Sequence, residues 1–240
     1  MIGSTTSITR TADIHVLDVR CSCPAGTVED EVTSAFELVF MTSGAFRRCG
    51  TLVDPAVAYV TVPGREQRIE HVTHGDRGIV VLVSERLAAE LALDHGTLVR
   101  TTAHDGIVAR ARRGIGEEPW LEAMASLTPM RRPNVTDERR RAVQRVRDAI
   151  AAEPGGRWSL RDAAAVAGYA PHHLSRVFRR VTGTTLTEHR DRVRLSHAAE
   201  LAADGMPLAD VAAACGFADH GHLTRRAKQV LGVVPSRLRA

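Results

Sequence analysis

Residues 160–169 read LRDAAAVAGY, and residues 208–217 read LADVAAACGF, so one pattern occurs twice at a spacing of 48 residues. Each copy continues into a second matching stretch, HLSR in the first and HLTR in the second. The pattern predicts a short helix, a tight turn and a longer helix in each copy. At the turns, Gly168 and Gly216 are expected to adopt a left-handed backbone that a Cβ atom disfavours. The repeat therefore indicates two helix-turn-helix motifs, whose second helix typically enters the major groove of DNA.

The second helix of each copy has one apolar and one polar side. Leu174, Val177 and Phe178 have the spacing of a buried face in the first copy, as Leu223 and Ala227 have in the second. The polar residues left facing outward are His172, Ser175, Arg176, Arg179 and Arg180 in the first copy, and His220, Thr224, Arg225 and Lys228 in the second.

Charge is distributed unevenly between the two halves of the chain. Residues 134–240 carry 18 Lys and Arg against 11 Asp and Glu, a net charge of +7, whereas residues 1–133 carry 14 against 17, a net charge of −3. A polyanion would bind the basic half. The structural alternative is a stacked helical repeat whose arginines only solvate its surface.

Local signals set the expected boundaries of the other helices in the C-terminal half. Thr136 is a predicted N-cap, and Pro154 ends the helix that it begins. Ser159 is expected to cap a short helix that ends near Ala167, and a longer helix is predicted over residues 188–203.

The N-terminal half has a different pattern. From His15 to Val83, short apolar runs alternate with Gly, Pro and Asp, which predicts an antiparallel β sandwich or barrel. Ser84 is a predicted N-cap for a helix, and another helix is expected over residues 117–127. The chain is thus expected to be α+β, with a β domain over residues 1–127, a proline-containing linker over 128–135 and an all-α domain over 136–240.

Composition narrows the class of protein. The 240 residues are 44% apolar and 25% charged, as in ordinary globular proteins. The sequence contains neither an apolar run of about 20 residues nor the layout of a secretory signal, so we expect a cytoplasmic protein. Its 4 cysteines are too scattered for a disulfide framework. Phosphate-binding loops, nucleophile elbows and zinc-protease helices are absent from the sequence, so we expect no enzyme, no catalytic residue and no cofactor.

The C-terminal half resembles the AraC family of bacterial transcription regulators over residues 137–239. The resemblance rests on AGYAPHHLSRVF at 167–178, ACGFADHGHLTR at 214–225 and GVVPSR at 232–237. It implies two helix-turn-helix units joined by a rigid helix, here residues 188–203. These units would present their recognition helices to successive major grooves of promoter DNA, about 34 Å apart.

The resemblance also implies which residues contact DNA. The base-reading positions would be His172, Ser175 and Arg176 in the first motif, and His220, Gly221, Thr224 and Arg225 in the second. Arg176 and Arg225 are the best candidates for bidentate guanine contacts. Arg179, Arg180, Arg226 and Lys228 are expected at phosphates.

Two positions depart from the family pattern. Ala227 stands where a Phe is usual, and Gly221 stands where a polar side chain is common. The second motif is therefore expected to pack less tightly and to read fewer bases.

The N-terminal half is similar to the cupin-type sensing domain of some members of this family. The similarity rests on PGREQR at 63–68, His71 and the pair Gly75 and Asp76. It implies binding of an unknown small-molecule or metal effector, dimerisation through helices within residues 84–127, or both. A regulator of this kind, activator or repressor, has RNA polymerase as a possible further partner.

An alternative from a different class is a metal- or thiol-responsive sensor. Cys21 and Cys23 lie two residues apart and would face the same side of a strand, where Cys49, His71 and His74 would converge on them. Because neither spacing is that of a recognised closed metal site, we assign no metal ligand from the sequence alone.

The remaining residues of this kind have structural interpretations. Cys215 is expected to pack in a core, and His189 and His197 are expected to be surface or packing residues.

Overall fold

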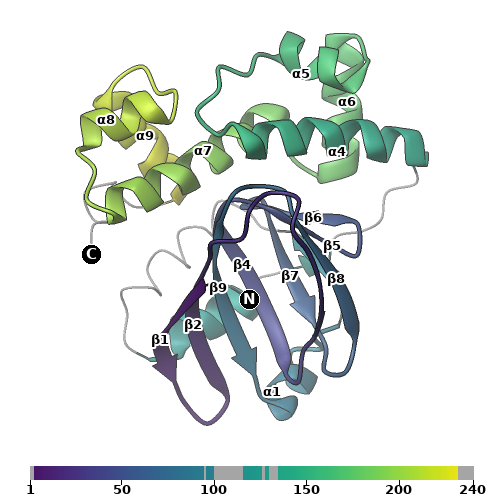
Figure 1. Ribbon diagram of the computed structural model, residues 1–240, viewed down its shortest axis with the longest axis vertical. Coiled ribbons are helices and arrows are strands. Elements are labelled where there is room, and N and C mark those ends of the chain that lie inside the picture. The colour runs from purple at the N-terminus through teal and green to yellow at the C-terminus, as the bar shows by residue number, and fades with distance from the viewer. Residues whose placement is uncertain (1–2, 95, 100–115, 126–127, 130–134, 232–240) are drawn as a thin grey trace.

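The protein has a β-rich half and a helical half. The computed structural model describes residues 3–94, 96–99, 116–125, 128–129 and 135–231. In Figure 1 the strands form the lower body, and the later helices lie across one end of it. Among the described residues, no helix is long and apolar enough to span a bilayer.

Two antiparallel sheets build the β-rich half, as predicted. Within the described residues, the seven-stranded sheet has the order β1 (Gly3–Arg10), β2 (Ile14–Cys21), β9 (Asp76–Val83), β4 (Phe36–Ser43), β7 (Val57–Thr61), β10 (Gly96–Val99) and β11 (Thr128–Pro129). The four-stranded sheet has the order β3 (Val28–Val32), β8 (Glu66–His71), β5 (Phe46–Arg48) and β6 (Thr51–Val53).

The larger sheet is buried on both faces at its centre, because successive residues of a strand point to opposite sides. In β4, Leu38 and Phe40 pack in the core that contains α1 (Glu85–Glu90) and α3 (Glu118–Ala125). Val39 and Met41 pack on the other face, against residues of the smaller sheet. The space between the two sheets is therefore a second core.

Three strands were not predicted: β1, β10 and β11. Of these, β11 corrects the expected linker. Thr128 and Pro129 form β11, paired with Leu98 and Val99 of β10, so the expected linker begins inside the sheet. Residues 130–134 lie outside the described residues. β1 is mostly exposed and polar, so it lacks the apolar alternation by which strands are recognised.

Six helices are described in the C-terminal half, where they follow the predicted order. They are α4 (Asp137–Ala152), α5 (Leu160–Ala167), α6 (Pro171–Thr182), α7 (Leu186–Ala203), α8 (Leu208–Ala214) and α9 (His220–Leu231). Thr136 and Ser159 are N-caps, as predicted. The connecting helix α7 begins two residues earlier than expected, because Thr185 and Glu188 form a capping box at its start.

Two separate cores divide this half around α7. α4, α5 and α6 enclose the first core, to which α7 contributes Leu186 and Val193. α8 and α9 enclose the second, to which α7 contributes Leu195, Ala198 and Ala202. One helix thus forms part of both motifs and sets their relative position.

Candidate nucleic-acid interface

Both predicted turns have the left-handed glycine that the repeat requires. Gly168 ends α5 with φ 72°, and Gly216 follows α8 with φ 69°. Beyond each glycine, the next residue donates its N–H back into the preceding helix, from Tyr169 to Ala164 and from Phe217 to Ala212, both at 2.9 Å. The predicted geometry of the two turns is confirmed.

An aromatic contact fixes each turn against its second helix. The ring of Tyr169 meets His173 edge-on at a centroid distance of 4.7 Å, and Phe217 meets His222 in the same way at 5.5 Å. These equivalent pairs occupy the same place in both copies. The two histidines therefore support the motifs from within, a role that the sequence alone did not indicate.

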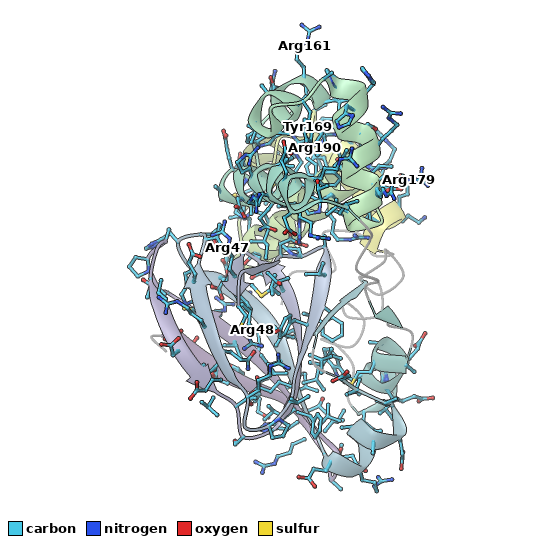
Figure 2. All side chains as sticks on the ribbon, turned by 90° about the vertical axis from the view of Figure 1, so that its right-hand side faces the viewer. Arg47, Arg48, Arg161, Tyr169, Arg179 and Arg190 are labelled. Carbon is cyan, nitrogen blue, oxygen red and sulfur yellow. The ribbon has the colours of Figure 1, made fainter. Side chains whose placement is uncertain are left out.

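The outward face of α6 is exposed along its length. Leu174, Val177 and Phe178 are buried on its inner side. The five predicted contact residues are all exposed: His172, Ser175, Arg176, Arg179 and Arg180. In Figure 2, Arg179 and the α5 residue Arg161 project from the surface of the helical half. This face thus presents polar and cationic groups to the surroundings.

The outward face of α9 is narrower. His220, Arg225 and Lys228 are exposed, whereas Gly221 and Thr224 are half-buried. Thr224 Oγ1 is buried and hydrogen-bonds to no described residue. Fewer of the predicted contact residues are thus accessible on α9 than on α6.

Arg226 is engaged inside the protein. It is half-buried and forms an ion pair with Asp191 of α7, and it also donates to Gln229 Oε1 at 2.6 Å. The guanidinium of Arg226 therefore binds Asp191 and Gln229 in the structure, whereas the resemblance implied that it contacts a phosphate.

Asp219 caps the start of α9. Its Oδ1 accepts the N–H of His222 at 2.7 Å, and this hydrogen bond is the main reason why the pKa of Asp219 lies below its ordinary value. A carboxylate at this point complements the helix dipole, so it stabilises the start of α9.

The β-rich half contacts the helical half through α4 and α7. Asp54, at the end of β6, is fully buried and accepts hydrogen bonds from Arg147 Nε and Nη2 at 3.1 and 2.8 Å. His189 Nε2 lies 3.5 Å from Asp54 Oδ2. The outward residues of α6 stay exposed beside this contact, so docking of the two halves leaves that face accessible.

Burial and charge set the ionisation of this cluster. Burial by itself would raise the pKa of Asp54, but the neighbouring charges of Arg147 and His189 hold it below its ordinary value. Burial lowers the pKa of His189 to about 4, although Asp54 opposes the shift. His189 is therefore a neutral imidazole at pH 7, buried as a packing residue in line with the prediction.

The cysteines and histidines of the β-rich half are brought together only in part. Within the described residues, Cys21, Cys23 and His71 form one group whose possible ligand atoms all lie within 4.8 Å of one another. Cys49 is exposed in the turn between β5 and β6, and neither Cys49 nor His74 belongs to this group. The expected convergence of five residues is therefore wrong for these two.

Burial suppresses the acidity of two thiols. It raises the pKa of Cys21 to about 12, with a smaller contribution from the hydrogen bond to Cys23. Burial likewise raises the pKa of Cys215 to about 12 within the second helical core, where that residue packs as predicted. Because the thiolate is the reactive form, neither residue has the character of a fast thiol switch.

The space between the sheets contains polar groups as well as apolar ones. Arg48 donates to Glu31 Oε2 at 3.0 Å and lies over the rings of Phe46 and Tyr59 at 5.7 and 5.0 Å. Its Nε and Nη1 atoms, and both amide atoms of Gln67, are buried and hydrogen-bond to no described residue. Figure 2 shows Arg48 within the sandwich and Arg47 nearer to the helices.

The C-terminal part of the chain matches known proteins. Residues 163–240 match a family model described as a helix-turn-helix domain. Over 81 residues the chain is 38% identical to the HTH-type transcriptional activator AarP of Providencia stuartii, and the match covers 33% of this chain and 60% of AarP. The chain thus spans less than two thirds of that relative.

Several solved structures are similar at low overall scores. A probable AraC family regulator from Rhodopseudomonas palustris is 28% identical, covers 42% of this chain and 99% of its own, and has a TM-score of 0.38. ToxT from Vibrio cholerae is 10% identical over 93% of this chain and 97% of its own, with a TM-score of 0.39.

Proposed function

We propose that this chain, whose C-terminal half carries an AraC-type double helix-turn-helix domain, is a sequence-specific DNA-binding transcription regulator. The observation that carries the proposal is the duplicated motif with its two outward polar faces, on α6 and α9, both packed on α7. A purely structural repeat does not require exposed arginines at equivalent positions of both second helices.

The proposed contacts divide into two kinds. His172, Ser175 and Arg176 on α6, and His220, Gly221, Thr224 and Arg225 on α9, would read base edges. Arg179, Arg180 and Lys228 would contact phosphates, and Arg226 would do so only after leaving Asp191. Arg176 and Arg225 are proposed to form bidentate contacts with guanine, each contributing about 1–3 kcal/mol of discrimination.

A selection of random duplex DNA with the purified full-length chain at near-physiological salt tests this proposal. We expect enrichment of two sequence blocks about one helical turn apart. Arg176→Ala is expected to relax selection in one block and Arg225→Ala in the other. Arg86→Ala, which removes an exposed arginine of the β-rich half, is the matched control and should leave the selected sequence unchanged.

The same experiment can contradict the proposal. Binding without sequence enrichment, lost at moderate salt, would indicate a scaffold with only non-specific affinity for polyanions. Enrichment that survives both recognition-helix variants would contradict the assignment of the two arginines.

We also propose that the β-rich half, within residues 1–127, senses a signal. The unpartnered buried atoms of Arg48 and Gln67 support binding of a small effector with an acidic or amide group between the sheets, because buried polar groups need hydrogen-bond partners. Thermal unfolding measured against a set of small carboxylates and amides tests this. A stabilising compound should lose its effect in Arg48→Met, and no stabilisation by any of them would count against the proposal.

Assembly and transcriptional partners belong to the same proposal. Dimerisation through α1 and α3, and contact with RNA polymerase, follow from the family resemblance rather than from a contact in the structure. Light scattering of the chain in solution tests the first, and a promoter-dependent transcription assay with purified polymerase tests the second.

A further inference from the structure

Three strand ends meet at one edge of the sandwich. Cys21 is the last residue of β2, His71 is the last residue of β8, and Asp76 is the first residue of β9. Cys21 and Asp76 are paired across the two antiparallel strands, and Cys23 follows two residues after Cys21. Both sheets thus contribute potential ligands to one place.

The separations among these groups are close to those of a metal centre. The ligand atoms of Cys21, Cys23 and His71 all lie within 4.8 Å of one another, and Cys21 Sγ is 4.0 Å from His71 Nδ1. With zinc bond lengths of about 2.3 Å to sulfur and 2.0 Å to nitrogen, tetrahedral coordination needs ligand separations of roughly 3.5–3.8 Å. Side-chain adjustments of about 1 Å would therefore bring these three ligands to coordinating separations.

Asp76 is the candidate fourth ligand, next to the group of three but outside it. Asp76 Oδ2 hydrogen-bonds to His71 Nδ1 at 2.9 Å, and both atoms would exchange this contact for bonds to the metal. Two thiolates, one imidazole and one carboxylate are a donor set that zinc accepts.

We propose that Cys21, Cys23 and His71, with Asp76 as the fourth ligand, form a tetrahedral site for a thiophilic divalent cation of the Zn²⁺ class. Cys23 and His71 are almost fully buried, whereas Cys21 is partly exposed. An ion can thus enter past Cys21 and be held by groups that are already oriented.

Groups around the proposed site would hold its ligands in orientation. Glu29 Oε1 lies 3.3 Å from His71 Nε2, so Nε2–H donates to this carboxylate when Nδ1 carries the metal. The N–H of Cys23 donates to Cys21 Sγ at 3.3 Å. Gly44 also fits closely here, since a Cβ at this residue would lie 2.7 Å from the carbonyl oxygen of Gly75.

Binding follows simple proton accounting. Each thiol releases one proton to water as its sulfur bonds to the metal, while the imidazole binds through its unprotonated Nδ1 and the carboxylate binds ionised. Neither an oxidant nor a reductant takes part. Waters of the hydrated ion leave as the four ligands replace them.

The strand ends that carry these ligands also contact the connecting helix. Arg20, beside Cys21, forms an ion pair with Asp204 at 3.5 Å, and Arg77, beside Asp76, forms one with Glu200 of α7. Metal binding would thus fix the edge of the sandwich that docks on the helix shared by both motifs. This regulatory consequence rests on the proposed function, whereas the metal site itself does not.

Titration of the reduced full-length protein with Co²⁺ and Zn²⁺ tests the site. We expect one metal ion per chain by native mass spectrometry, and a thiolate-to-cobalt charge-transfer band. Cys23→Ser should lower the affinity for the metal by more than the roughly 10–100-fold expected for Glu29→Gln, which changes only the outer hydrogen-bond partner of His71. Circular dichroism and thermal unfolding establish that each variant is folded.

Cys49→Ser is the matched control, because Cys49 is a cysteine of the same half that lies outside the described group. Its metal affinity should equal that of the wild type. The proposal is overturned if the reduced wild type takes up no metal, or if Cys49→Ser weakens binding as much as Cys23→Ser.

DNA binding with Zn²⁺ and with a chelator, measured on the selected duplex, tests the regulatory link. A metal-dependent change in affinity that disappears in Cys23→Ser supports the link. Stoichiometric metal with unchanged DNA affinity leaves the site and removes the link. If the selection yields no duplex, the proposed function fails, while the metal titration still decides the site by itself.

Discussion

The two helix-turn-helix motifs have the same turn geometry but differ in the side chains that pack behind the turn. Alignment of HLSR with HLTR places Phe178 opposite Ala227 and Val177 opposite Arg226. Phe178 is fully buried and meets the ring of His189 at 5.4 Å, whereas Ala227 fills the equivalent place with a single methyl group. The same backbone pattern therefore encloses a larger apolar core in the first motif.

Polar contacts partly replace apolar ones in the second motif. Arg226 forms an ion pair with Asp191 of α7 at the position where Val177 packs in the first motif. A partly exposed ion pair contributes less to stability than the burial of a valine side chain. We infer that the first motif is the more stable unit.

The motifs also differ in their attachment to the β-rich half. Close to the first motif, Asp54, Arg147 and His189 form a buried cluster. Near the end of α7 that serves the second motif, Arg77 pairs with Glu200, and Arg20 pairs with Asp204 where both side chains are about half exposed.

The first prediction concerns the two cores. Phe178→Ala should lower the free energy of unfolding by about 3–5 kcal/mol, because it leaves a cavity in a fully buried site. Ala227→Gly, at the equivalent position, should cost only about 1 kcal/mol. Urea unfolding followed by circular dichroism measures both. Equal losses would refute the inferred difference between the motifs.

The second prediction concerns the buried cluster. Arg147→Met leaves Asp54 buried without the guanidinium that donates two hydrogen bonds to its Oδ2, and should cost about 3 kcal/mol or more in stability. Arg20→Met removes an exposed pair and should cost less than about 1 kcal/mol. If the double variant Asp54→Leu, Arg147→Met is as unstable as Arg147→Met alone, an unpaired buried charge is not the cause.

The third prediction is a dependence of stability on pH. The pKa of His189 is about 4 in the folded protein against an ordinary 6.5, so the unfolded chain takes up a proton first as pH falls. The contribution of neutral His189 to the free energy of unfolding is complete above pH 6.5. It falls by up to about 3 kcal/mol as the pH is lowered from 6.5 to 4. Asp54 shifts in the same direction but titrates below its ordinary 3.8, outside this window.

A variant isolates the contribution of His189, since the pKa of His197 is also lowered by burial. Thermal unfolding of wild type and His189→Gln at several pH values gives the difference between the two profiles. Parallel profiles between pH 6.5 and 4 would show that His189 has no part in the acid sensitivity.

The salt dependence of DNA binding should distinguish Arg179 of α6 from Arg226 of α9. Arg179→Ala should reduce the slope of log affinity against log salt by about 0.9, because one phosphate contact is lost. Arg226→Ala should leave the slope unchanged, since Arg226 pairs with Asp191. Fluorescence anisotropy with the selected duplex at several salt concentrations measures both slopes. A reduced slope for Arg226→Ala would mean that this ion pair opens on DNA.

Features that depend on near neighbours in the chain could be predicted from the sequence. The repeat, the left-handed turns at Gly168 and Gly216, and the caps at Thr136 and Ser159 follow from groups within a few residues of one another. The buried faces of α6 and α9 follow from helical spacing in the same way. These predictions required no knowledge of how distant segments pack.

Features that join distant segments depend on how the chain packs in three dimensions. β1 and β11 are strands because β2 and β10 offer them hydrogen-bond partners, and their own residues carry little pattern. Cys49 and His71 were equal candidates in the sequence, yet strand pairing brings His71 to Cys21 and leaves Cys49 exposed. Such contacts depend on register and on the docking of the two halves, and spacing along the chain encodes neither.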